Sequence, residues 1–177
     1  DHDVSKIDPA NDQIWEFSTE TGEPPALALG STYGLRAFSM RVFPRFQNGR
    51  ISVTDPSAFF EYPTVLYSAP NFIHIHFSPF NFIDVNLRVW VPTSQVVVGQ
   101  VNLDLKGDQP EVMAMEWVAM LSPFPGGTIM TAMDYSINTI LAGKSKNLEP
   151  VFLLTGAPRA GLSSNPGLGV TISLRPG

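Results

Sequence analysis

Cysteine is absent from this 177-residue sequence, which excludes disulfide bonds and thiolate metal sites and favours a reducing compartment. Charged residues are also scarce. They make up 15% of the chain, where about a quarter is usual for a globular protein. The 11 Lys and Arg residues form no basic run. Because a phosphate backbone is bound by clustered cations, we expect no nucleic-acid partner.

Long hydrophobic runs are missing too. No apolar stretch approaches the roughly 20 residues that a membrane helix requires, and the first residues show no signal-peptide pattern. We therefore expect no membrane partner, and a cytoplasmic location is favoured. The chain begins at Asp1 and ends at Gly177, directly after a strand-like run, so we expect a domain cut from a longer protein.

Hydrophobic residues make up 44% of the chain, and 16 prolines and 14 glycines divide them into short runs. Such punctuation is typical of many short elements, and the length fits one domain. We expect residues 1–24 to form an N-terminal arm and residues 25–177 to form a single β-sandwich domain.

Alternation of apolar and polar residues with a period of two predicts the strands. The clearest example is residues 84–91, in which every second residue is Val or Leu. Similar patterns occupy residues 36–43, 72–77, 96–105, 136–142, 151–154 and 170–174. In 36–43 we expect Phe38 to share the apolar face. Asn48-Gly49 between two such runs predicts a tight hairpin.

Residues 111–121 are ambiguous, because Met, Ala, Leu and Glu favour a helix although both faces read as apolar. The neighbouring runs are strands, and a central strand is apolar on both faces, so we predict a strand here. The sequence as a whole predicts an all-β protein, an antiparallel two-sheet β-sandwich.

Trp90 shares its predicted strand face with Asp84, Asn86 and Arg88. A flat aromatic ring beside hydrogen-bonding groups suits a sugar, so these four residues are candidate carbohydrate contacts. The alternative is that Trp90 packs under a loop or against a neighbouring domain.

Two histidines and four carboxylates are the remaining candidates for chemistry. His74 and His76 lie two apart on one strand and could chelate a metal with Glu61 or Asp84 as third ligand. The alternative, an exposed or hydrogen-bonded pair, is favoured, so no metal and no cofactor is predicted. Glycoside hydrolysis needs two carboxylates across one bond, and no spacing joins any two of Glu61, Asp84, Glu116 and Asp134, so no catalytic residue is predicted. Glu116, in an apolar strand, is expected at an edge or paired with Arg88 or Arg41.

The middle of the chain contains three motifs, followed by two predicted strands, whose layout resembles that of a known family. The motifs are Phe60-Glu61-Tyr62-Pro63, the run at residues 73–80 and Val89-Trp90-Val91-Pro92, and residues 96–105 then lead into 113–121. This layout resembles the N-terminal β-sandwich domain of bacterial glycoside hydrolases and phosphorylases with an (α/α)6 barrel, such as glucoamylase-like and maltose-phosphorylase-like enzymes. The resemblance implies that catalytic carboxylates sit in a helical barrel of the same protein, which would be the partner of this domain.

Three functions follow as hypotheses. The first is a non-catalytic β-sandwich domain of a bacterial carbohydrate-active enzyme, which packs against and rims a separate catalytic domain. The chain would then be no enzyme by itself, whereas its parent protein would be a glycoside hydrolase. The second is a free-standing carbohydrate-binding or lectin-like module that contacts oligosaccharide directly. The third is a small complete β-sandwich enzyme.

Overall fold

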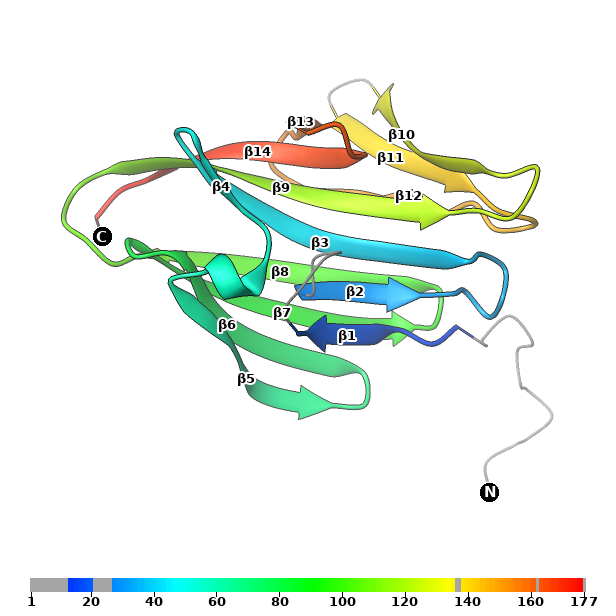
Figure 1. The fold of residues 1–177 in the computed structure, drawn as a ribbon, viewed down its shortest axis with the longest axis horizontal. Coiled ribbons are helices and arrows are strands. Elements are labelled where there is room, and N and C mark those ends of the chain that lie inside the picture. Colours follow the sequence, from blue (N-terminus) through cyan, green and yellow to red (C-terminus); the bar gives the residue numbers. More distant parts are fainter. Residues whose placement is uncertain (1–12, 21–26, 136–137, 162, 177) are drawn as a thin grey trace.

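The computed structural model describes residues 13–20, 27–135, 138–161 and 163–176. These residues form antiparallel strands in two stacked sheets, A and B, with a small third sheet, C, at one end of sheet A (Figure 1). This architecture confirms the predicted all-β sandwich. In the described part of the chain, no helix is long and apolar enough to cross a membrane.

Sheet A contains seven strands, and its central strands β3 and β9 come from distant parts of the chain. The order is β1-β2-β3-β9-β14-β13, with β4 paired to β3 by the hairpin at Asn48-Gly49. Gly49 takes a φ of 55°, a left-handed conformation that favours glycine, so the hairpin prediction is confirmed. The strands are β1 (Glu16–Thr19), β2 (Leu27–Ser31), β3 (Ser39–Asn48), β4 (Ile51–Val53), β9 (Glu111–Ser122), β13 (Arg159–Ala160) and β14 (Gly167–Leu174).

Sheet B is a meander of four strands, in which each strand pairs with the next along the chain. Its strands are β5 (Glu61–Ala69), β6 (Phe72–Phe80), β7 (Ile83–Thr93) and β8 (Val96–Leu105). Sheet C contains β10 (Thr128–Tyr135), β11 (Asn138–Lys144) and β12 (Val151–Phe152). A 3-10 turn, η2 (Pro56–Ala58), precedes β5 and is capped by the Asp55 side chain, which accepts a bond from the Ser57 amide.

The main core lies between the facing surfaces of sheets A and B. Every second residue of β6 and β7 points into it, and Ile75, Phe77 and Ile83 are completely buried. Phe59 stacks on Phe77 with 5.3 Å between ring centroids, and Phe46 of sheet A meets both rings edge-on. This alternation leaves the other half of each strand of sheet B facing outward.

A second core lies between one end of sheet A and sheet C. One face of β9 contributes to both cores: Met113 and Met115 face sheet B, whereas Ala119 and Leu121 pack with Met130 and other residues of the second core. The residues 111–121 therefore form the predicted strand, because burial on two cores overrides their helical propensity.

The strand predicted at residues 36–43 is wrong in its first half. Strand β3 begins only at Ser39, and Phe38 is 60% exposed rather than in the core. Positive φ angles at Tyr33, Gly34 and Leu35 turn the chain just before it, so residues 35–38 belong to that turn. Residues 136–137 of the run predicted at 136–142 lie outside the described residues, and the rest form β11.

Glu116 is buried on the outward face of β9, with 1% of its surface exposed. Its cation is Arg45, the directly opposite residue on β3, with Nη1 3.4 Å from Oε2, and not Arg88 or Arg41 as expected. The Ser163 hydroxyl donates to Oε1 at 3.2 Å. A Cβ at Gly161 or Gly167 would overlap this carboxylate, so neither glycine can be replaced unless the Glu116 side chain moves.

We expect the Arg45→Met substitution to lower the free energy of unfolding by about 3 kcal/mol, because it leaves a buried carboxylate without its cation. That figure is the low end for a buried pair, since the Arg45 side chain is 27% exposed. The double substitution Arg45→Met with Glu116→Met should recover most of the loss, and urea denaturation measures all three variants. Arg50→Met, at an exposed position, serves as the control. Equal losses for Arg45→Met and Arg50→Met would contradict the pairing.

Candidate functional site

The outward face of sheet B holds the four residues predicted to contact carbohydrate. Asp84, Asn86, Arg88 and Trp90 alternate along β7 with the buried Val85, Leu87 and Val89, so all four point away from the core. Of the four, Arg88 is the most exposed, while Trp90 is partly buried.

Neighbouring strands extend each of these positions into a row across the sheet, because paired residues point to the same side. The pairing of β6, β7 and β8 aligns Phe72, Trp90 and Val98, then His74, Arg88 and Gln100, then His76, Asn86 and Asn102. A fourth row begins with the Asp84–Asp104 pair. The face therefore changes from aromatic at one end to polar in the middle and acidic at the other end.

Three aromatic residues form the first end. Tyr67 of β5 pairs with His74 and is 59% exposed. Its ring lies 5.7 Å from that of Phe72, which is the direct cross-strand partner of Trp90. This arrangement provides ring faces of the type on which the apolar side of a sugar can stack.

The middle of the face consists of histidine and amide side chains together with Arg88. His74 Nε2 lies 3.3 Å from Asn86 Oδ1, and Asn86 Nδ2 donates to Asp104 at 3.3 Å. Gln100 and Asn102 are exposed beside them. Amide groups offer both donors and acceptors, as hydroxyl-rich ligands require.

The acidic end is organised by Lys106, which follows β8 directly. Its Nζ lies 2.7 Å from Glu61 Oε1, 2.8 Å from Asp84 Oδ1 and 3.0 Å from the hydroxyl of the buried Ser78. Ser78 also donates to Asp84 at 2.6 Å. The Lys106 ammonium therefore joins the ends of β5, β6 and β7.

These contacts set the charge states of Asp84 and Lys106. Burial raises the pKa of Asp84, but hydrogen bonds from Lys106 and Ser78 and the nearby positive charges together bring it below its ordinary 3.8. Hydrogen bonds to Asp84 and Glu61 raise the pKa of Lys106 above its ordinary 10.5. Both groups are charged at neutral pH, so Asp84 does not supply the protonated acid that glycoside hydrolysis needs.

The two predicted histidines have different partners. His76 Nε2 lies 3.2 Å from Asp84 Oδ1, and with Glu61 these groups place ligand atoms within 4.8 Å of one another. His74 instead contacts Asn86 in the next row. The Lys106 ammonium already lies where a metal bound by Glu61 and Asp84 would need to be, so the geometry favours an ion-pair network over a metal site.

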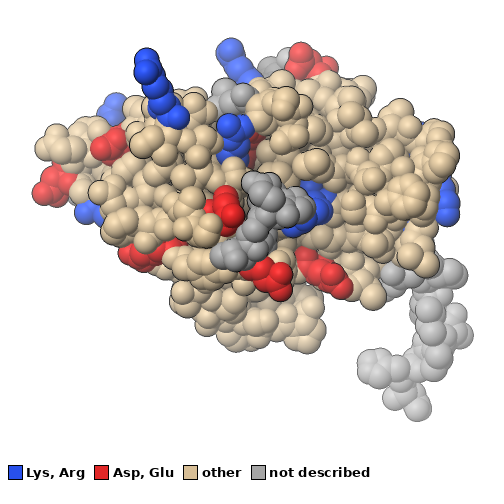
Figure 2. Space-filling view, viewed as in Figure 1, with Lys and Arg blue, Asp and Glu red and all other residues tan. Residues whose placement is uncertain are grey.

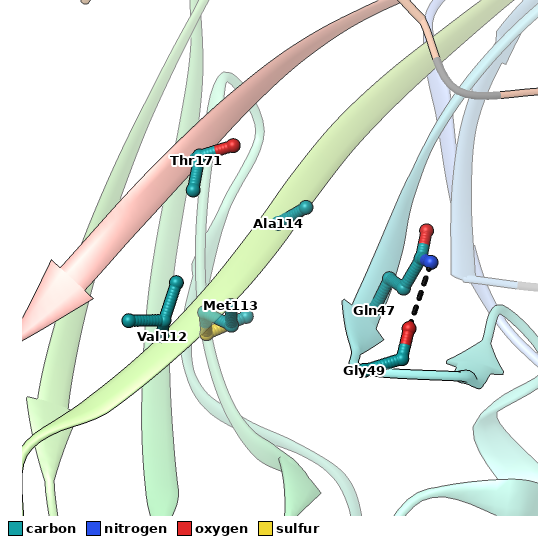
Figure 3. A pocket seen from close by; sticks show the side chains of 6 residues that line it. All are labelled: Gln47, Gly49, Val112, Met113, Ala114 and Thr171. Atoms are coloured by element: carbon teal, nitrogen blue, oxygen red, sulfur yellow. Dashed lines mark hydrogen bonds between the residues drawn. The ribbon is translucent and has the colours of Figure 1, made fainter.

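The four candidate carboxylates fall into three places. Glu61 and Asp84 come together at Lys106, whereas Glu116 is buried on sheet A and Asp134 of β10 accepts a bond from Thr139. The small hollow of about 190 Å³ on sheet A beside the β3–β4 hairpin holds no titratable group; Figure 3 shows Gln47 bonded there to the Gly49 carbonyl.

Sequence reasoning missed the residues that neighbouring strands add to this face, namely Tyr67, Phe72, Gln100, Asn102, Asp104 and Lys106. The signal that could have found most of them is the short turn between β6 and β7 and between β7 and β8, since a short hairpin turn fixes which residues pair.

The Lys106→Met substitution should lower the melting temperature at neutral pH, because it leaves Glu61 and Asp84 without their cation. For Asp84, whose pKa is lowered, the stabilisation is present above pH 3.8 and is lost as the pH falls through its folded-state pKa. For Lys106, whose pKa is raised, it is present below pH 10.5 and is lost as the pH rises through its folded-state pKa. The difference in melting temperature between the unsubstituted chain and Lys106→Met should therefore be largest between these two pH limits and should shrink beyond them.

Melting curves from pH 2 to pH 12 measure this difference. Lys144→Met is the matched control, because Lys144 pairs with Glu149 at 3.0 Å where both side chains are more than half exposed. Such surface pairs contribute about 0–1 kcal/mol. A pH-independent difference for Lys106→Met would contradict the ionic role of the network.

Comparison with known proteins leaves the chemistry of this face to be argued from the chain itself. No protein-family model matches the sequence, and no curated protein or solved structure matches it either. The resemblance to the N-terminal β-sandwich domains of (α/α)6-barrel enzymes therefore stays a prediction.

Proposed function

We propose that this chain is a carbohydrate-binding accessory domain, which holds an oligosaccharide on the outward face of sheet B beside a separate catalytic domain. The observation that carries the proposal is the cross-strand alignment of Trp90 and Phe72, with Tyr67 adjacent, beside the polar row of His74, Arg88 and Gln100. Aromatic faces and amide groups within one row of each other suit a ligand that is apolar on its ring faces and polar at its edge.

The charge of the face favours neutral sugars over anionic ones. Asp84, Asp104 and Glu61 lie at one end, and Lys106 already engages two of these carboxylates. The one Lys or Arg in the polar middle rows is Arg88, which is exposed and is paired across the sheet with His74 and Gln100. An oligosaccharide with free hydroxyl groups therefore fits the face better than a sulfated or phosphorylated one.

The accessory role is supported by the low charge of the surface. Figure 2 shows Lys, Arg, Asp and Glu scattered singly or in small groups over a mostly uncharged surface. The lowered pKa of Asp84, which its contacts with Lys106 and Ser78 cause, argues against the third hypothesis, a complete glycosidase that uses this carboxyl group as its acid. A free-standing binding module would use the same residues, and the two roles differ only in whether a catalytic domain is attached.

Oligosaccharide binding should be detectable as thermal stabilisation. We expect glucans, maltose, trehalose or a related oligosaccharide to raise the melting temperature, since a ligand at 100 times its dissociation constant adds about 2.7 kcal/mol. Trp90→Ala should weaken binding of that sugar by about 30-fold, the loss expected at a central aromatic contact, and Tyr67→Ala should weaken it as well.

Tyr135→Ala is the matched control for Tyr67→Ala, because Tyr135 is 60% exposed but lies on sheet C. Calorimetric titration of the four proteins compares their affinities, and melting curves without sugar check that each variant folds. Equal weakening by Tyr135→Ala, or no stabilisation by any sugar in the panel, would contradict sugar binding on sheet B. The second outcome would leave the purely structural role of the first hypothesis.

A further inference from the structure

A cavity of about 1300 Å³ lies between sheets A and B, on the side of the sandwich away from β5. Its floor is the inward face of sheet A, with Phe17, Met115 and Trp117 among its residues, and Trp15, directly before β1, also lines it. Leu87 and Val89 of β7 and the apolar residues of β8 form the opposite wall, and the segment 147–156 forms a third. The lining is mainly apolar, and most of its polar groups are amides and hydroxyls.

Strand β8 runs along this cavity. Six of its ten residues line it, namely Val96, Val97, Gly99, Gln100, Val101 and Leu103. In the part of the chain that the structure describes, β8 is the last strand of sheet B and pairs only with β7. Its outer N–H and C=O groups therefore border a large apolar cavity.

The two edges of sheet B differ in how they are protected against pairing with another strand. Natural edge strands are usually blocked by proline, by bulges or by charged residues. Strand β5 has Pro63 and two breaks in its register with β6. Strand β8 has no proline, its one charged residue is Asp104 near its end, and its register with β7 is unbroken from Val98 to Leu105. The β8 edge is thus regular and competent to pair.

The size of the cavity indicates the kind of occupant. Pockets for drug-sized molecules measure about 300–1000 Å³, so this cavity suits something larger than a single small ligand. An extended peptide on a strand edge projects alternate side chains to one side, so an apolar half would enter the cavity and a polar half would continue the outward face. A second copy of the chain fits less well, because the inward side chains of its own β8 would point to its own sheet A.

Charge adds a constraint on the partner. Asp104 lies on the outward face of β8 directly opposite Asp84, whose charge is already engaged by Lys106. A Lys or Arg on the outward side of an added strand would balance Asp104, since opposite charges across a strand pair are favourable.

We propose that β8 is a docking site for an extended segment of a partner protein, about ten residues long, with apolar residues at every second position and a basic residue on the other side. The segment adds to sheet B as an antiparallel fifth strand and fills the cavity with its apolar side chains. The proposal does not rest on sugar binding, because Gln100 is the one residue of the outward rows that also lines the cavity.

Intrinsic fluorescence reports occupancy directly, because Trp15 and Trp117 line the cavity whereas Trp90 lies on the outward face. The probe is a synthetic ten-residue peptide of alternating Val and Thr with one Thr replaced by Lys, added to the full chain carrying Trp90→Phe. We expect a blue shift of the tryptophan emission that saturates. A peptide of the same composition in shuffled order, and one N-methylated along one edge, should each bind at least tenfold more weakly.

Two substitutions in the protein itself test the site independently of changes in the peptide. Val101→Lys places a charge in the cavity wall and should abolish the shift, whereas Thr64→Lys, at an exposed position on β5 at the opposite edge of sheet B, should keep it. Circular dichroism checks that each variant folds. If Val101→Lys does not fold, the comparison of the N-methylated and unmodified peptides on the chain with Val101 still tests strand addition.

Three results would overturn the proposal. Equal binding of the N-methylated and unmodified peptides would exclude strand addition. A shift produced by a fatty acid but not by the peptide would identify a small apolar ligand as the occupant. Self-association of the chain through β8, seen by sedimentation and lost in Val101→Lys, would identify a second copy.

Discussion

Sheet B can bury Ile75, Phe77, Val85 and Leu87 only in one pairing register, because a slip by one residue would turn these side chains to the solvent. The same register decides what faces outward. Each buried residue of β6 and β7 fixes the direction of its polar neighbour, so the rows across sheet B are a consequence of how the core is packed. The core therefore fixes which side chains make up the candidate site, which favours a preorganised binding face.

Charged residues are few in this chain, and two groups of them form ion pairs at specific points of the sheets. Arg45 and Glu116 pair within sheet A beneath a segment that contains Gly161 and Gly167, and Lys106 joins three strands at one end of sheet B. The first pair joins strands from distant parts of the sequence, whereas the second site joins successive strands of one meander. Removing one partner of a buried pair leaves an uncompensated charge, so each pair favours the strand arrangement that brings its partners together.

The sequence predicted where the strands lie far better than which strands pair with one another. Period-two alternation located β6, β7, β8 and β9 and placed Asp84, Asn86, Arg88 and Trp90 on one face. It did not identify Arg45 as the partner of Glu116, because that pairing depends on β3 lying beside β9, some 70 positions later in the chain. Phe38 was misplaced because a turn with non-glycine residues at positive φ has no strong local signal.

The cavity and the free edge of β8 were beyond sequence analysis for a related reason. Both depend on the order of strands in two sheets and on the separation between the sheets, and alternation along one strand carries no information about either. The alternating valines of β8 predict an ordinary strand with one face in the core. Only the structure shows that its inward side faces a cavity and its outer edge has no partner among the described residues.

The central claim is that the outward face of sheet B is the surface that meets carbohydrate. The most direct measurement is a nitrogen-15 NMR titration of the chain with an oligosaccharide, followed at its three tryptophan indole signals. The account predicts that the Trp90 signal and the amides of the outward rows of β6, β7 and β8 shift, while the signals of Trp15 and Trp117 in the cavity stay in place. Shifts at Trp15 and Trp117 with none at Trp90 would contradict the account.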